Sequence, residues 1–214
     1  TYYTAASMSF MEPWLFGKKP TSFSLSGYYT RQTNSYYFYQ NPDEYFEVYG
    51  VAASLGNRLK WPDNYFVLYH ELSWQAYNLH DWGYNFLFST GQSNNFSYKV
   101  TLARNSTDQQ VFPRQGSDFT FSVQLTPPYS LFRDPNTNYQ SMTDQERYRW
   151  IEYHKWTFKG ALYTKIVGDL VLMARAQFGY LGTYNKKWGY SPFEGYQVGG
   201  DGMSGYNIYG IDII

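Results

Sequence analysis

The sequence contains no cysteine, and charged residues make up only 16% of it. Without cysteine there are no disulfide bonds and no thiolate metal sites. The 17 basic and 17 acidic residues cancel, so no net positive charge favours binding to nucleic acid. No segment approaches the roughly 20 consecutive apolar residues that a membrane-spanning helix needs. A membrane-spanning β-barrel stays possible, because each of its strands needs only about 9–11 alternating residues.

Aromatic residues are abundant, at 22% of the chain with 25 Tyr, 16 Phe and 7 Trp. Several lie in or beside short turns, including Trp14, Phe16, Trp61 and Phe112. Tryptophan and tyrosine collect at membrane interfaces, where the ring meets lipid and its polar atom meets the headgroups. The aromatic pattern therefore favours a barrel in a membrane.

Residues 118–127 alternate strictly between apolar and polar side chains. The apolar positions are Phe119, Phe121, Val123 and Leu125. The polar positions between them are Thr120, Ser122, Gln124 and Thr126. Successive side chains of a strand point to opposite faces, so this pattern predicts a strand with one apolar and one polar face.

Eight segments follow a similar pattern and are expected to be strands. They are residues 2–11, 22–32, 46–59, 65–77, 95–105, 118–127, 155–167 and 170–183. The connections alternate in length. Short ones are expected at 12–20, 60–64, 107–117 and 168–169, and long ones at 33–45, 78–94, 131–154 and after 184. Short turns at one rim and long loops at the other are typical of outer-membrane barrels. We therefore predict an all-β fold, a transmembrane antiparallel up-and-down β-barrel.

The alternation also assigns residues to the two sides of the barrel wall. Lipid-facing positions are expected to include Phe119, Phe121, Val123, Leu125, Phe158 and Leu162. Lumen-facing positions are expected to include Lys159, Tyr163, Lys165, Arg175 and Gln177. A charge on the lipid face would cost about 2–4 kcal/mol at the membrane midplane. Arg104 is the expected exception, since it lies at a strand end where it can reach the interface.

One short helix is expected in the third long loop, which would be extracellular. Thr143 and Glu146 have the spacing of a capping box, in which each side chain binds the other residue's backbone N–H. The predicted helix covers residues 144–153.

No pattern in the sequence supports catalysis. His70, His80 and His154 lack the close spacing of a metal site, and no nucleophile or phosphate-loop motif is present. We therefore expect no enzyme activity, no cofactor and no metal.

Three stretches resemble the BamA family of insertases, which fold outer-membrane proteins. Residues 9–20 (SFMEPWLFGKKP) are similar to a strand-end turn of that family, and residues 55–66 (LGNRLKWPDNYF) resemble the versions found in Bacteroidota. Residues 191–200 (SPFEGYQVGG) resemble the lead-in to the family's large inward-folding loop. The family's Arg-Gly-aromatic motif does not occur before the chain stops at Ile214.

The resemblance covers essentially the whole chain and implies that it is the middle part of a sixteen-stranded barrel. Residues 1–214 would then form a partial barrel domain ending in the lumen-directed loop, without the POTRA domains or the first and last strands. Both chain ends look cut, which agrees with a piece of a longer protein. The loop residues implied by the resemblance are Phe193, Tyr196, Gly199, Gly200 and Asp201.

The resemblance further implies that the protein inserts and folds barrel proteins in the outer membrane of a Gram-negative, Bacteroidota-like cell. Its implied partners are outer-membrane lipid and lipopolysaccharide, unfolded outer-membrane proteins, and accessory lipoproteins or other assembly subunits, with no nucleic acid. Two alternatives stay open from the residues alone. One is a passive pore or transporter barrel of another family, and the other is a soluble, aromatic-rich protein that binds carbohydrate.

Overall fold

The computed structural model describes residues 3–17, 21–36, 39–82, 88–132, 141–187, 189–191 and 193–196, with the side chains of 34–36 and 39–42 left out. Eight strands form one antiparallel sheet in the order β1 to β8, each paired with its neighbours in sequence. The strands are β1 (Tyr3–Glu12), β2 (Thr21–Tyr36), β3 (Tyr39–Arg58), β4 (Phe66–His80), β5 (Gly91–Asn105), β6 (Gly116–Leu125), β7 (His154–Val167) and β8 (Leu170–Gly182). The up-and-down topology and all eight predicted strands are confirmed.

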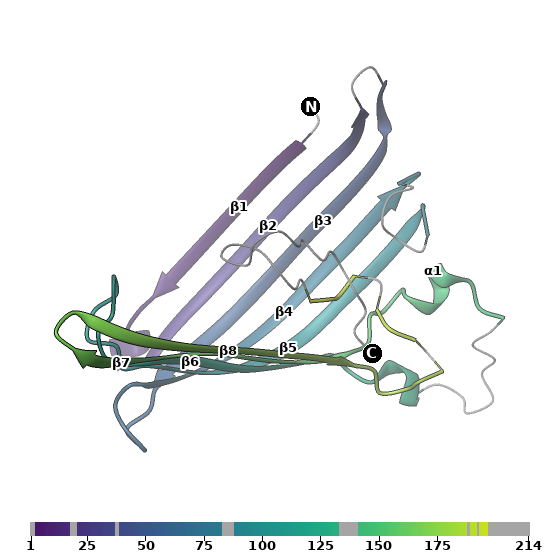
Figure 1. Ribbon diagram of the computed structural model, residues 1–214. Coiled ribbons are helices and arrows are strands. Elements are labelled where there is room, and N and C mark those ends of the chain that lie inside the picture. The colour runs from purple at the N-terminus through teal and green to yellow at the C-terminus, as the bar shows by residue number, and fades with distance from the viewer. Residues whose placement is uncertain are drawn as a thin grey trace.

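The sheet is strongly curved, and the segment 189–196 lies on its concave side (Figure 1). That segment contacts Tyr77 on β4, Asn95 on β5 and Lys155 on β7. The three contacts show that this segment crosses the sheet from β4 to β7 on that side. In the described residues β1 and β8 pair with β2 and β7 alone, so these eight strands form an open wall and not a closed barrel.

Four strands extend further than their sequence pattern predicts. β4 continues to His80 and β5 begins at Gly91, so the connection predicted at 78–94 is shorter than expected. β2 and β3 continue pairing up to the partners Tyr36 and Tyr39, with an irregularity between Thr33 and Asn34. The predicted long connection at 33–45 is therefore wrong. Backbone groups continue the ladder here although the side chains no longer alternate, because each strand satisfies the other's N–H and C=O groups.

The loop helix is present but shorter than predicted. α1 covers Asp144–Arg147, and both hydrogen bonds of the Thr143–Glu146 capping box are formed. The expected continuation to residue 153 is wrong, because the chain leaves the helix to pair with β5. There the Asn94 N–H donates to the Arg149 carbonyl, and the Ile151 N–H donates to the Asn94 carbonyl, both at 2.8 Å.

Among the described residues, the most deeply buried side chains lie around this pairing. β6 pairs with β5 only from Tyr98 onward, so the first half of β5 would otherwise have an open edge. Residues 149–151 cover that edge at Asn94. The side chains of Ile151, Glu152 and Tyr153 are each at most 1% exposed. Two short 3-10 helices, η1 (Leu15–Gly17) and η2 (Tyr129–Phe132), complete the described elements.

Within the described residues, no helix has the length and apolar character needed to cross a membrane.

Candidate functional site

The convex face of the sheet carries the side chains that the sequence assigned to lipid. In the register of β6 and β7, Phe121 lies opposite Phe158 and Phe119 lies opposite Gly160. Leu162 lies opposite Ser117 on the same face, and Val123 and Leu125 continue it along β6. Leu162 is 53% exposed although its side chain is wholly apolar. The face is therefore apolar and open, as a lipid-facing surface would be.

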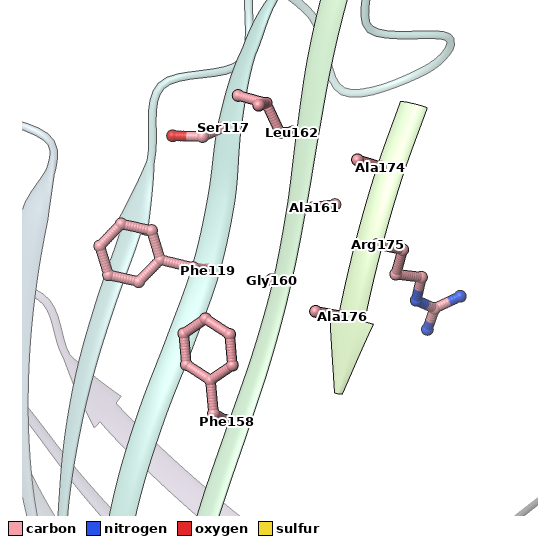
Figure 2. Close-up of a pocket in the computed structure, with 9 residues that line it drawn as sticks. All are labelled: Ser117, Phe119, Phe158, Gly160, Ala161, Leu162, Ala174, Arg175 and Ala176. Carbon is pink, nitrogen blue, oxygen red and sulfur yellow. The ribbon is translucent and has the colours of Figure 1, made fainter. Parts of the chain in front are cut away.

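A shallow apolar groove of about 330 Å³ lies on this face where small residues replace large ones. Gly160, Ala174 and Ala176 form its floor, and Phe119 and Phe158 stand beside it (Figure 2). Figure 2 also shows the Arg175 guanidinium pointing away from the two phenylalanine rings. Adjacent residues of β8 thus present alanine to one face and arginine to the other.

Charged residues do occur on the convex face, near the strand ends. Arg104 donates from Nε to an Asp63 carboxylate oxygen at 3.0 Å, and its NH2 group lies 2.9 Å from the same oxygen. Arg31 lies 3.4 Å from Glu47, which also accepts a hydrogen bond from the Tyr29 hydroxyl at 3.0 Å. The prediction that Arg104 is the exception is therefore incomplete, because Arg31 and Glu47 also lie on this face, and both arginines are paired with a carboxylate.

The concave face carries the residues that the sequence assigned to the lumen. Lys159 lies opposite Gln177, and Tyr163 lies opposite Met173. Lys165 on β7 and Arg175 on β8 lie at alternate positions from these residues, so their side chains point to the same face. All five predicted residues therefore share one face, the face on which the segment 189–196 docks.

Glu194 fixes that segment to the wall. Its Oε2 atom accepts a hydrogen bond from Lys155 Nζ at 3.0 Å, and its Oε1 atom accepts one from Asn95 Nδ2 at 3.2 Å. Lys155 also donates to the Gly195 carbonyl at 3.0 Å. The Lys155 and Glu194 side chains are 21% and 13% exposed, so the pair is shielded from most of the solvent. Shielding strengthens the attraction and makes loss of either partner costly.

Tyr196 forms the second attachment. Its hydroxyl donates to the Trp156 carbonyl at 2.5 Å and lies 3.0 Å from the Thr157 hydroxyl. Its ring packs directly over Gly179 of β8, and Lys155 Nζ lies 4.9 Å from the ring centroid. A side chain at residue 179 would occupy the space that the ring fills.

Phe193 forms the third attachment by stacking on Tyr77 of β4, with ring centroids 4.6 Å apart. We call Phe193, Glu194 and Tyr196 the loop anchor. It joins β4, β5, β7 and β8 across the hollow of the sheet, and its contacts are aromatic, ionic and hydrogen-bonded.

A buried network holds the wall side of the anchor in place. The Tyr153 hydroxyl accepts from Asn95 Nδ2 at 3.2 Å and from Gln124 Nε2 at 2.7 Å. Burial, and then the negative charge of Glu194, raise the pKa of Tyr153. Tyr153 therefore keeps its proton. The hydrogen bond to Tyr153 also holds the amide group of Asn95, which donates to Glu194.

The model of the Omp85 superfamily domain matches residues 1–212. The chain belongs to the Omp85 superfamily. Its fold is also similar to the crystal structure of BamA from Haemophilus ducreyi lacking POTRA domains 1-3, with a TM-score of 0.66 and 19% sequence identity. The match covers 94% of this chain and 37% of that one. None of the curated proteins matches the chain.

The Omp85 chain thus spans well under half the length of the BamA structure that it resembles. The superfamily membership and the barrel fold place it in an outer membrane of the Gram-negative type.

Of the loop residues assigned by resemblance, the structure brings Phe193 and Tyr196 onto the concave face of the Omp85 sheet. Gly199, Gly200 and Asp201 lie outside the described residues. Sequence reasoning missed Glu194, Lys155 and Asn95 as a group. The available signal was a glutamate between two aromatic residues, in a chain with few charges.

Proposed function

We propose that this chain is the middle part of the barrel of a BamA-type assembly factor, which inserts and folds β-barrel proteins in the outer membrane. Its host would be a Gram-negative bacterium of the Bacteroidota kind. The proposed substrates are unfolded outer-membrane proteins, and the proposed partners are outer-membrane lipid, lipopolysaccharide and accessory subunits of an assembly complex. The chain contributes no catalytic group of its own.

The docking of the loop anchor on the concave wall carries this proposal. Here Glu194 and Tyr196 hold a chain segment against the wall inside the hollow of the sheet. Within the Omp85 superfamily, that arrangement supports an insertase whose large loop folds inward. The open edges at β1 and β8 also fit a larger barrel, and we propose sixteen strands in all.

In this proposal the chain is a scaffold. The seam between the first and last strands, where substrate strands would enter, lies in parts of the protein outside residues 1–214. The wall described above would hold the seam and the loop in position, and the seam would lower the barrier to strand insertion.

The decisive experiment is reconstitution of the full-length protein in liposomes with a urea-unfolded outer-membrane barrel protein. We expect faster folding of the substrate than in liposomes that hold an unrelated passive barrel of similar size. Folding would be followed by the heat-dependent shift of gel mobility. Ion conductance without any acceleration of folding would contradict the proposal and favour the pore. Stable solution behaviour without detergent would favour the soluble carbohydrate-binding alternative.

A further inference from the structure

A second feature of the concave wall lies next to the loop anchor. It is a polar pocket of about 420 Å³ on β5, β6 and β7. Its lining consists entirely of polar side chains, namely Lys99, Thr101, Thr120, Ser122, Gln124, Lys155, Thr157 and Lys159. Three ammonium groups and four hydroxyl groups therefore surround one space, and no carboxylate lines it. We call it the lysine pocket.

The charge of the lysine pocket is only partly neutralised. Lys155 binds Glu194, whereas neither Lys99 nor Lys159 forms an ion pair within the described part of the chain. Two carboxylates lie nearby on the same face. Glu71 is the cross-strand neighbour of Lys99, and Asp118 precedes Thr120 by two residues on β6. Neither of them lines the pocket or lies within ion-pair distance of its lysines.

Glu194 shows what kind of group this wall binds. Its carboxylate is held at the border of the pocket by one ammonium group and one amide N–H. The adjoining space offers the same chemistry, with two further ammonium groups and hydroxyls that can donate hydrogen bonds. Hydrogen bonds from an ammonium to a carboxylate are among the stronger ones in proteins.

We propose that the lysine pocket binds a carboxylate side chain of an acidic polypeptide segment that enters the concave side of the sheet. Lys99 and Lys159 are its binding residues, and the hydroxyls of Thr101 and Ser122 complete the site. This proposal requires only that the concave face is open to water. It therefore stands or falls separately from the proposed insertase function.

The test measures binding of a fluorescein-labelled hexaglutamate peptide to the full-length protein in an uncharged detergent at low salt. Fluorescence anisotropy gives the dissociation constant. We expect the pair Lys99→Gln and Lys159→Gln to weaken binding about tenfold or more, because two charge-assisted hydrogen bonds are lost. The charge-retaining pair Lys99→Arg and Lys159→Arg is expected to bind within a few-fold of the unchanged protein.

The matched control is the pair Lys165→Gln and Arg175→Gln, which also removes two positive charges from the same face but outside the lysine pocket. Binding within twofold of the unchanged protein is expected there. An equal loss in the control would overturn the proposal, because it would show diffuse attraction to the whole wall. No peptide binding at all would also overturn it. So would displacement of the peptide by inorganic phosphate at concentrations where free glutamate has no effect, which would assign the pocket to phosphate.

Discussion

Gly179 leaves the space that the ring of Tyr196 occupies. A Cβ atom on residue 179 would lie 2.7 Å from Tyr196 Cε1 and 2.8 Å from Cζ. Carbon atoms in favourable contact are about 3.5–4.0 Å apart, so the ring would have to move. Its hydroxyl is held by Trp156 and Thr157, and a shifted ring would lose those hydrogen bonds. The glycine thus determines whether the loop anchor can dock.

Gly179→Val is therefore expected to release Tyr196 from the wall. The measurement is the rate of chymotrypsin cleavage after Tyr196, with the cut site identified by mass spectrometry, and it should rise several-fold. Gly27→Val is the matched control, because a Cβ atom at that strand position would have its nearest neighbour at 3.7 Å. Unchanged cleavage after Tyr196 in Gly179→Val would show that the ring does not depend on this space.

Lys155→Met is expected to weaken docking of the segment by about 1–3 kcal/mol, since Glu194 would stay buried without its charged partner. Hydrogen exchange of the backbone amides of Glu194 and Tyr196 measures the local opening. The double variant Lys155→Met with Glu194→Gln should cost less than the sum of the two single changes, because no buried charge is left unpaired. Lys165→Met is the control and should leave exchange unchanged. Additive costs in the double variant would argue against a direct pair.

Arg104→Met is expected to lower the temperature at which the full-length barrel unfolds. Arg104 is 21% exposed, binds Asp63 through two nitrogen atoms, and donates to Ser106 at 2.8 Å. The expected loss is about 1–3 kcal/mol. Heat-dependent gel mobility gives the comparison. The control is Arg114→Met, whose pair with Asp169 is exposed and should contribute little. Equal effects of the two changes would contradict the assigned role of Arg104.

The turn between β5 and β6 is expected to loosen only in acid. Hydrogen bonds from the backbone N–H groups, first of Arg114 and also of Gln115, hold the pKa of Asp108 below its ordinary value. A lowered carboxyl pKa means that its stabilising contribution is present above the ordinary value of about 4 and is lost as the pH falls through the lowered one.

The protection of the Arg114 amide, measured as its exchange rate relative to that of an unprotected amide at the same pH, should accordingly stay high at neutral pH and fall only below about pH 4. In Asp108→Asn the amide should exchange faster at neutral pH and respond less to acid. An acid response of the same size in both proteins would assign the change to another group.

The sequence predicts the wall well, because the alternation is local. Phe121 and Phe158 lie opposite each other on one face, as their parity requires. The capping box at Thr143 is equally local, and it is formed. The end of that helix is not local, since it depends on pairing with Asn94, which is 55 residues from Arg149.

The loop anchor could not be predicted for the same reason. Asn95 and Glu194 are 99 positions apart, and their contact depends on the register of several strands together with the curvature of the sheet. The alternation of side chains along the strand places Lys155 on the polar face. It does not indicate which segment of the chain will cover that face. The resemblance supplied the inward direction of the loop, and it supplied none of the contacts that hold it.

The cover that residues 149–151 place on β5 also affects what the wall can capture. A free strand edge is a template to which any extended chain can add. At Asn94 both backbone groups are already occupied by the protein's own chain, through Arg149 and Ile151. A protein proposed to handle unpaired strands would therefore present no competing site at this point of its wall. In the proposed function, substrate strands would then pair at the seam and would not pair with β5 at Asn94.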